Sequence, residues 1–191
     1  YIVLEGVHGI GKTTICRELK KRNGFRSLPE IKDVILQPPI LGLKSPNRLK
    51  SQLWFLRQII LKENKIPNDN SIVISDRGIT SILLYSKVLL DEYEFELIKS
   101  IINALNLREP DMEIILWASD EVIKERVEER CRTSKCAWSE DDLNYIREIN
   151  KEFYTYYKNF KDLKSIYLVD ASGSVDETCR KIEEIITKNL K

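Results

Sequence analysis

Short runs of β-branched and aliphatic residues alternate along this chain with longer segments whose apolar positions recur at helical spacing. This alternation is typical of βαβ units, in which helices cover both faces of a mostly parallel sheet. Strands buried on both faces are apolar throughout rather than at every second position. Such runs predict strands at Ile2–Glu5, Phe25–Leu28, Ser71–Ser75, Met112–Ala118 and Ser165–Val169.

Helical periodicity fills the intervals between these strands. The first helix is predicted from Lys12 to Arg22, because the pair Asn23 and Gly24 is a common helix end. No repeat, low-complexity tract or Gly/Pro/Ser-rich linker divides the chain, so residues 1–191 are expected to form one α/β domain. Residues 131–138 are polar, basic and without period, and are predicted to form a mobile lid loop. Further helices are predicted at Asn47–Glu63, Ser81–Leu90, Glu94–Leu105, Asp120–Arg130, Ser139–Asn159 and Ser174–Asn189.

Composition and charge narrow the range of partners. The chain carries 31 basic and 30 acidic residues, a formal net charge of +1, which gives no overall attraction for nucleic acid or an anionic membrane. The longest apolar runs, such as Ile114–Ala118, are far shorter than the ~20 residues of a membrane-spanning helix. Tyr1–Gly6 is charged too early for a secretory signal. We therefore expect a cytoplasmic protein that binds neither nucleic acid nor membrane.

The first strand leads directly into a phosphate-binding pattern, GxxxxGK[ST], which ends where the first helix begins. Backbone N–H groups of such a loop point inward, and the helix N-terminus adds partial positive charge at the same place. Lys12 is expected to reach the β and γ phosphates, and the Thr13 hydroxyl to bind Mg²⁺. The predicted nucleotide-binding residues are Gly6, Val7, His8, Gly9, Ile10, Gly11, Lys12, Thr13 and Thr14.

A second pair of charged residues, Asp76 and Arg77, follows the strand predicted at Ser71–Ser75. Ligands of open α/β sheets bind at the carboxyl edge, where this pair is expected to lie. Asp76 can orient Mg²⁺ or its waters, and the planar guanidinium of Arg77 can bridge donor and acceptor phosphates. Both are therefore candidate catalytic residues.

The order and spacing of these motifs resemble the thymidylate kinase family of nucleoside monophosphate kinases. Ser75–Arg77, followed by Ser81 and Tyr85, looks like the family's DR motif with its serine and tyrosine at the same offsets. Pro110–Asp111 and Arg126–Arg130 are similar to its approach to the lid, and Asp170–Ser174 to its adenine-contacting loop.

This resemblance implies a three-layer P-loop NTPase fold with a five-stranded parallel sheet, ATP and Mg²⁺, and a homodimer. It also implies that Arg57 and Arg77 contact the acceptor phosphate, that Tyr85 belongs to the acceptor site, and that Ala171, Ser172 and Gly173 lie against the donor adenine.

Lid cations that arrive on closure stabilise a transferred phosphoryl group and exclude water. The family places one arginine either in the phosphate loop or in the lid, and Gly9 stands at the loop position here. The lid is therefore expected to supply it. Of Arg126, Arg130, Arg132 and Lys135, we take Arg130 and Arg132 as catalytic candidates; Arg126 also lies at helical spacing from acids, as in an exposed ion-pair helix.

Four residues depart from the thymidylate kinase pattern. His8 stands where the family carries an acid facing the acceptor sugar, and either binds the sugar or points outward. Glu30 stands where an arginine would hold the acceptor phosphate, and resembles the general base of deoxynucleoside kinases. Gln52 and the aromatic residues Trp54 and Phe55 resemble the base-reading helix of those enzymes, and Trp54 is taken as the candidate, although an aromatic pair on an amphipathic helix is also common in a core.

The sequence thus predicts a kinase that transfers the γ-phosphoryl group of ATP to the small nucleotide dTMP. Two alternatives remain open. One is a deoxynucleoside kinase that phosphorylates a 5′-hydroxyl, and the other is a P-loop nucleotide-binding module without catalysis.

Overall fold

A five-stranded parallel sheet forms the centre of the fold, in the strand order β2–β3–β1–β4–β5. The structure is a computed structural model that describes residues 1–30, 40–133, 142–163 and 165–189. Chain connections run from β1 to one side of the sheet and later to the other, so β1 lies where the strand order reverses. The strands are β1 (Ile2–Glu5), β2 (Arg26–Leu28), β3 (Val73–Asp76), β4 (Met112–Trp117) and β5 (Ile166–Asp170).

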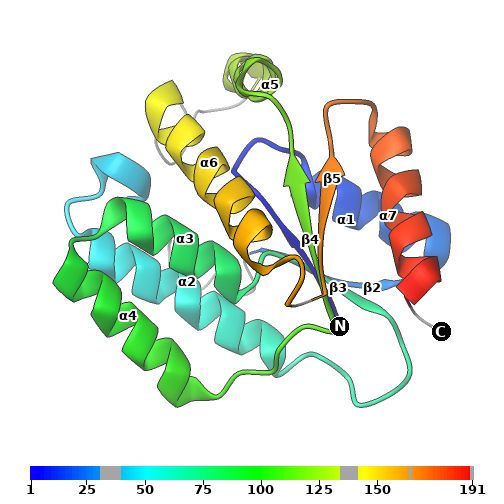
Figure 1. Cartoon of the computed structure of the whole chain (residues 1–191), viewed down its shortest axis with the longest axis horizontal. Coiled ribbons are helices and arrows are strands. Elements are labelled where there is room, and N and C mark those ends of the chain that lie inside the picture. Colours follow the sequence, from blue (N-terminus) through cyan, green and yellow to red (C-terminus); the bar gives the residue numbers. More distant parts are fainter. Residues whose placement is uncertain (31–39, 134–141, 164, 190–191) are drawn as a thin grey trace.

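Helices cover both faces of this sheet. In Figure 1, α1 and α7 lie on one side, α2, α3 and α6 on the other, α4 lies outside α2 and α3, and α5 lies beyond the carboxyl ends of the strands. The helices are α1 (Lys12–Asn23), α2 (Arg48–Glu63), α3 (Ile79–Leu89), α4 (Glu92–Leu105), α5 (Asp120–Thr133), α6 (Leu143–Phe160) and α7 (Val175–Asn189), with a short 3₁₀ turn at Gly42–Lys44.

The sequence starts several of these helices with side-chain caps. Asn47, Asp91 and Asp142 each accept a hydrogen bond from the backbone N–H three residues later, at 2.7, 2.8 and 3.0 Å. Such a bond satisfies one of the N–H groups that a helix leaves unpaired at its first turn.

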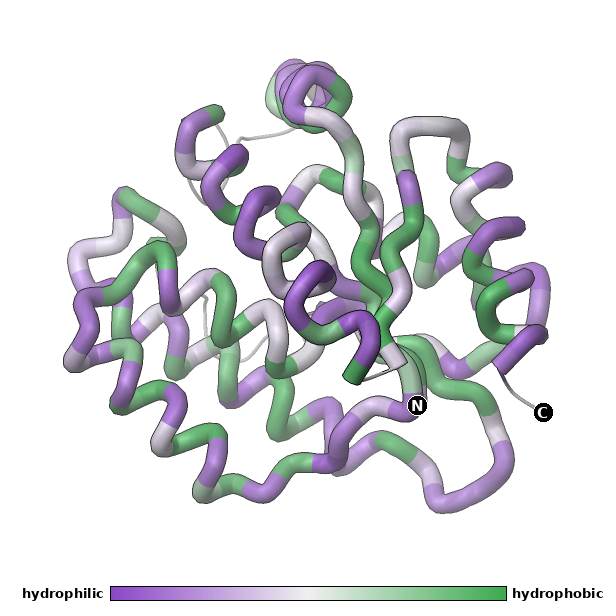
Figure 2. The backbone as a smooth tube through the Cα atoms, viewed as in Figure 1, coloured by the Kyte–Doolittle hydropathy of each residue, from purple (hydrophilic) through white to green (hydrophobic). Residues whose placement is uncertain are grey.

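The core lies between the sheet and its helical layers. β1 is buried along its whole length, and Ile114, Ile115 and Leu116 of β4 are completely buried. Figure 2 shows the central strands as mostly hydrophobic, whereas hydrophobic and hydrophilic residues alternate along the outer helices. Within the described part of the chain, no helix is both long and apolar enough to cross a membrane.

The structure confirms the predicted α/β class, all five strands and all seven helices, with end shifts of a few residues. One boundary prediction is wrong. Helix α5 continues through Cys131, Arg132 and Thr133, so the segment expected to be a loop at 131–138 begins as helix. The rest of that segment, including Lys135, lies outside the described residues.

Candidate active site

The phosphate loop is held close to the sheet by a backbone contact that requires glycine. Gly6 has a φ of 136°, and a Cβ atom at this position would lie 2.6 Å from the carbonyl oxygen of Leu116 in β4. No L side chain fits so close to a backbone oxygen, and positive φ adds strain for any residue except glycine. The loop therefore begins directly on the carboxyl end of the sheet.

Lys12 is folded back over its own loop. Its Nζ donates to the carbonyl oxygens of Gly6 at 3.0 Å and Val7 at 2.8 Å. Burial, reinforced by the nearby positive charge of Arg77, lowers the pKa of Lys12 to about 7. An anionic phosphate in the loop would offset both effects.

Gly9 lies against the helix that leads to the predicted lid. A Cβ atom on Gly9 would lie 2.7 Å from the Cγ2 atom of Val127, and its φ of 83° is again unfavourable for other residues. The loop position that carries an arginine in some thymidylate kinases therefore has no room for one here.

Thr13 and Asp76 are brought together from α1 and β3. The Thr13 hydroxyl donates to Oδ2 of Asp76 at 2.5 Å, while the buried Oδ1 atom of Asp76 has no hydrogen-bond partner. A hydroxyl oxygen beside a carboxylate with a free oxygen suits Mg²⁺, which binds one or two protein oxygens together with phosphates and waters. The residues present thus fit the Mg²⁺ that the phosphate-loop pattern predicts.

Arg77 lies at the centre of the site. Its Nε donates to Oε1 of Glu30 at 2.5 Å, and its Nη1 donates to the Gly6 carbonyl and the Ser81 hydroxyl, both at 3.0 Å. Its Nη2 donates to the Tyr85 hydroxyl at 3.3 Å. All three guanidinium nitrogens have partners, so the side chain is fixed between the phosphate loop and α3.

Glu30 remains ionised in this environment. Burial raises its pKa, but the positive charges of Arg77 and Lys12 outweigh burial and hold the pKa of Glu30 below its usual value. The carboxylate is only partly exposed and faces the same space as Arg77. It can therefore act as a base at neutral pH.

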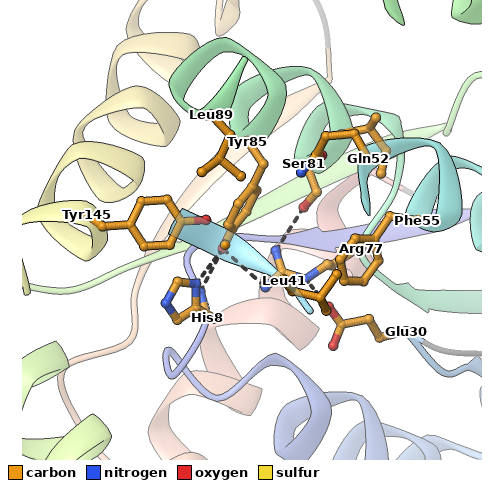
Figure 3. Close-up of a pocket in the computed structure, with 12 residues that line it drawn as sticks. His8, Glu30, Leu41, Gln52, Phe55, Arg77, Ser81, Tyr85, Leu89 and Tyr145 are labelled. Atoms are coloured by element: carbon orange, nitrogen blue, oxygen red, sulfur yellow. Dashed lines mark hydrogen bonds and ion pairs between the residues drawn. The ribbon is translucent and has the colours of Figure 1, made fainter. Parts of the chain in front are cut away.

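A cavity lies beside this ion pair, between the phosphate loop and helices α2, α3 and α6 (Figure 3). Most of its exposed wall is apolar, with several polar groups placed around it, as is typical of small-molecule sites. The polar groups are His8, Glu30, Gln52, Arg77, Ser81, Tyr85 and Tyr145, and the remaining wall is formed by Leu41, Gly42, Phe55, Ile82 and Leu89.

His8 points into the structure rather than outward. Its Nδ1 lies 3.0 Å from the Tyr85 hydroxyl, its ring packs against Tyr145 at 5.6 Å between centroids, and its buried Nε2 has no partner. Burial, together with the charges of Arg77, Lys12 and Arg130, lowers the pKa of His8 well below its usual value. The ring is therefore neutral and can accept or donate one further hydrogen bond.

Helix α2 supplies part of the cavity wall, but not with every residue expected. Gln52 and Phe55 line the cavity, and the Gln52 amide oxygen lies 3.4 Å from the Ser86 hydroxyl. Trp54 does not line it: its ring is largely buried and packs edge-on against Phe55 at 5.2 Å. Arg57 is also absent from the lining, because it lies beyond Phe55 along the helix. The aromatic residue that α2 contributes to this cavity is Phe55 rather than Trp54.

A second cavity lies where α1 meets the loop after β5. Ile10, Gly11, Thr14, Ala171 and Gly173 line it, so the structure brings the phosphate loop and the predicted adenine loop together. Ser172 adjoins this wall, and its carbonyl oxygen accepts from Arg126 at 3.3 Å.

The predicted lid cations differ in where they lie. Arg130 is near enough to Glu30 and Arg77 for their charges to influence its pKa. Arg132 is 72% exposed and pairs with Glu129 at 3.5 Å on the surface of α5, so this structure does not bring it to the site. Arg126 forms no surface ion pair in the described chain but binds backbone carbonyls, as described below.

Three residues of the site were missed by sequence reasoning. Tyr145 lines the cavity beside the Glu30–Arg77 ion pair from α6. Two buried charged residues, Glu5 and Lys62, bind the backbone around Arg77. Glu5 was recognisable as a charged residue inside an apolar strand. Lys62 gave no signal, because a lysine on an amphipathic helix is usually exposed.

Comparison with known proteins gives one family match over nearly the whole chain: the model of the deoxynucleoside kinase family matches residues 2–191. The curated relatives carry a different name. A thymidylate kinase of Mycoplasmoides gallisepticum is 27% identical over 207 residues, covering 100% of this chain and 95% of that protein. A probable thymidylate kinase of Archaeoglobus fulgidus is 29% identical over 202 residues, covering 100% and 97%.

Solved structures show the same fold under both names. A deoxyadenosine kinase from M. mycoides, with dCMP and a flexible dCDP bound, has a TM-score of 0.78 at 22% identity and covers 100% of this chain and 99% of that one. Thymidylate kinase from Candida albicans has a TM-score of 0.73 at 20% identity, covering 99% and 91%. At these identities the likeness shows the P-loop kinase fold. It does not show which acceptor the chain uses, so the acceptor has to be inferred from the chemistry of the site.

Proposed function

Because the chain belongs to the deoxynucleoside kinase family, we propose that it transfers the γ-phosphoryl group of ATP to the 5′-hydroxyl of a deoxynucleoside. Family membership makes the chain an ATP-dependent phosphotransferase that acts on a deoxynucleoside or a nucleoside monophosphate. The proposal concerns which of these two acceptors it uses.

The observation that carries the proposal is the ion pair between Glu30 and Arg77 at the mouth of the cavity. A hydroxyl acceptor has a proton that must leave as its oxygen attacks, and a carboxylate within reach can take it. An ionised Glu30 facing the cavity supplies such a base, since Arg77 and Lys12 keep its pKa low.

The same ion pair disfavours a phosphate acceptor. A nucleoside monophosphate brings about two negative charges at neutral pH, comparable to a phosphorylated side chain. Glu30 would repel that charge, and its carboxylate already pairs with Nε of Arg77. The wall residues therefore suit a neutral nucleoside better.

Gln52 adds a group that can read a base. Its side chain is 97% buried at the cavity wall, opposite the phenolic groups of Tyr85 and Tyr145. The Ser86 hydroxyl lies beside the amide oxygen, which leaves the amide N–H₂ free to donate to a ring nitrogen or carbonyl of a base. Phe55 supplies an apolar ring on the same wall.

For the donor, the backbone of Gly6–Thr13 and the side chain of Lys12 would hold the phosphates, and Thr13 with Asp76 would hold Mg²⁺. The metal, when bound, neutralises phosphate charge and orients the β and γ phosphates. In the transfer, the 5′-oxygen forms a bond to Pγ, the bond from Pγ to the bridging oxygen of ADP breaks, and the hydroxyl proton passes to Glu30. Arg77 stabilises the negative charge on the transferred group.

A second candidate is the transfer to dTMP. Its support is that curated relatives of this chain are named thymidylate kinases or probable thymidylate kinases. In that reaction the acceptor is already ionised and Glu30 is not needed as a base, so the two candidates make opposite predictions for this residue.

The test measures ADP release with ATP and Mg²⁺ against deoxynucleosides and deoxynucleoside monophosphates, for the wild type and Glu30→Gln. If a deoxynucleoside is the acceptor, the substitution lowers kcat by about 10²- to 10⁴-fold, the usual contribution of a general base. A matched control is Glu96→Gln, which removes an exposed ion pair with Lys99 on α4.

Turnover of dTMP alone, with kcat unchanged or raised in Glu30→Gln, would refute the proposal in favour of the second candidate. ATP binding without turnover of any acceptor would instead support a non-catalytic nucleotide-binding module.

A further inference from the structure

Lys62 is a completely buried lysine that has no role in either candidate reaction. It lies in the last turn of α2, with 1% of its surface exposed. Its Nζ donates to two successive backbone carbonyls, those of Asp76 at 2.8 Å and Arg77 at 2.7 Å. Burying an ammonium group costs several kcal/mol unless strong partners compensate. A lysine kept here at such a cost calls for a physical reason.

That reason lies in the backbone of Arg77. Arg77 has a φ of 68°, in the left-handed region that residues other than glycine, asparagine and aspartate rarely adopt. A conformation of this kind costs about 1–3 kcal/mol and persists only where the surroundings enforce it. In the described chain, only Asn106 shares this feature among the other non-glycine residues, and Asn106 is a helix C-cap.

The surroundings of Arg77 enforce its conformation on both sides. Its N–H donates to the carbonyl of Leu4 at 3.0 Å, and its carbonyl oxygen accepts from Lys62 and from the Ser75 hydroxyl at 2.8 Å. The next N–H, that of Gly78, donates to Glu5 at 2.8 Å. Of these partners, Lys62 alone holds two adjacent carbonyls. Burial lowers the pKa of Lys62 to about 8, so its ammonium form still predominates at neutral pH.

We propose that Lys62 is a positioning residue: its ammonium group holds the Asp76–Arg77 peptide in the left-handed turn that aims the Arg77 side chain at the acceptor and the phosphate loop. The inference rests on the proposed function in that Arg77 acts on the transferred group. Left-handed geometry turns the side chain of Arg77 back across the phosphate loop, where its Nη1 meets the Gly6 carbonyl.

Lys62 also links helix α2, which forms part of the cavity wall, to the turn at Arg77. Gln52 and Phe55, which line the cavity, lie on the same helix, about 15 Å and 10 Å of helix rise from Lys62. Its bonds to β3 therefore fix the wall that faces the base relative to the turn that faces the reacting group. A shift of about 1 Å in such an alignment can cost about 10²-fold in rate.

The test compares Lys62→Met, which keeps the length of the apolar stem but removes the ammonium, with Lys50→Met, an exposed lysine on the same helix. We expect Lys62→Met to lower kcat by about 10²-fold while the KM for ATP stays within about threefold, because most donor contacts lie on the phosphate loop and on the loop after β5. Lys50→Met should match the wild type. A folded Lys62→Met with kcat within about twofold of the wild type would overturn the proposal.

Amide hydrogen exchange gives a readout that a merely structural role would not produce. Loss of the hydrogen bonds from Lys62 to the backbone should speed amide exchange at Arg77 and Gly78 at least tenfold, while Ile114 and Ile115 in the central strand keep their protection. Equal acceleration everywhere would mean that Lys62 only adds global stability, and would refute the positioning role. If Lys62→Met does not fold, Lys62→Gln, whose amide keeps one donor, is measured in the same way and judged by the same outcomes.

The kinetic arm uses whichever acceptor the wild type converts. Failure of deoxynucleoside turnover would count against the proposed function alone, since Arg77 faces the acceptor with dTMP as well. The exchange experiment needs no activity at all, so the two proposals fail separately.

Discussion

Arg126 ties together three elements around the donor cavity, and its removal should weaken ATP binding specifically. From α5, its guanidinium donates to the carbonyl oxygens of Ile10 at 3.2 Å, Ala171 at 2.7 Å and Gly173 at 3.1 Å. The first belongs to the phosphate loop, and the other two to the loop that follows β5. The sequence left Arg126 as either a lid cation or a member of an exposed ion-pair helix, whereas the structure places it on backbone carbonyls.

The size of the effect follows from the kind of bonds lost. A hydrogen bond to a charged group contributes about 1.5–3 kcal/mol. The carbonyl oxygens freed by Arg126→Met become accessible to water, so we assign this value to the loss of all the Arg126 hydrogen bonds together. If ATP must then order the loop at residues 171–173 as it binds, its dissociation constant should rise about 10- to 150-fold.

The measurement is calorimetric titration of Arg126→Met with ATP or ADP, beside the KM for each substrate. The acceptor KM should stay within about threefold of the wild type, because Arg126 does not line the acceptor cavity. Lys124→Met is the matched control: it lies on the same helix, and its only described ion pair, with Glu128 at 3.9 Å, is half exposed. ATP affinity within about twofold of the wild type in Arg126→Met would show that the carbonyl contacts do not order the donor site.

Two further predictions concern the phosphate loop. Because burial lowers the pKa of His8, the folded chain binds fewer protons there than the unfolded chain, so the free energy of unfolding should rise with pH up to about 6.5 and then level off. His8 is the chain's only histidine, so its ring resonances in NMR report this directly, and titration near pH 6.5 would contradict the burial argument. Gly6→Ala should lower the thermal unfolding midpoint by several degrees and abolish ATP binding, because its methyl group would overlap the Leu116 carbonyl; a soluble variant with wild-type ATP affinity would show that the loop can move away from β4.

Local sequence patterns determined most of the fold. The five strands are apolar runs and the helices carry their own caps and apolar stripes, so each element could be predicted from neighbouring residues alone. The phosphate loop was equally readable, because its chemistry depends on glycines, Lys12 and Thr13 at fixed spacing. Asp76 and Arg77 were predicted at the carboxyl edge because they directly follow a buried strand.

Residues that depend on helix orientation were predicted less well. Trp54 and Phe55 are adjacent in sequence but about 100° apart around α2, so only the packing of α2 against α3 decides which ring reaches the cavity. Arg132 illustrates the same limit, since α5 continues past Arg130 and directs this residue to the surface.

The sequence by itself determined that the chain has a phosphate-binding loop, because the pattern of that loop consists of consecutive residues. Only the tertiary structure decided the environment of each charge: that Glu30 pairs with Arg77, that Arg126 binds carbonyls, and that Lys62 is buried beneath a left-handed turn. These contacts join residues far apart in the chain, 47 positions in the case of Glu30 and Arg77 and 116 in the case of Arg126 and Ile10. The physical reason is that burial and partner choice arise from packing between elements, which no local pattern of residues records.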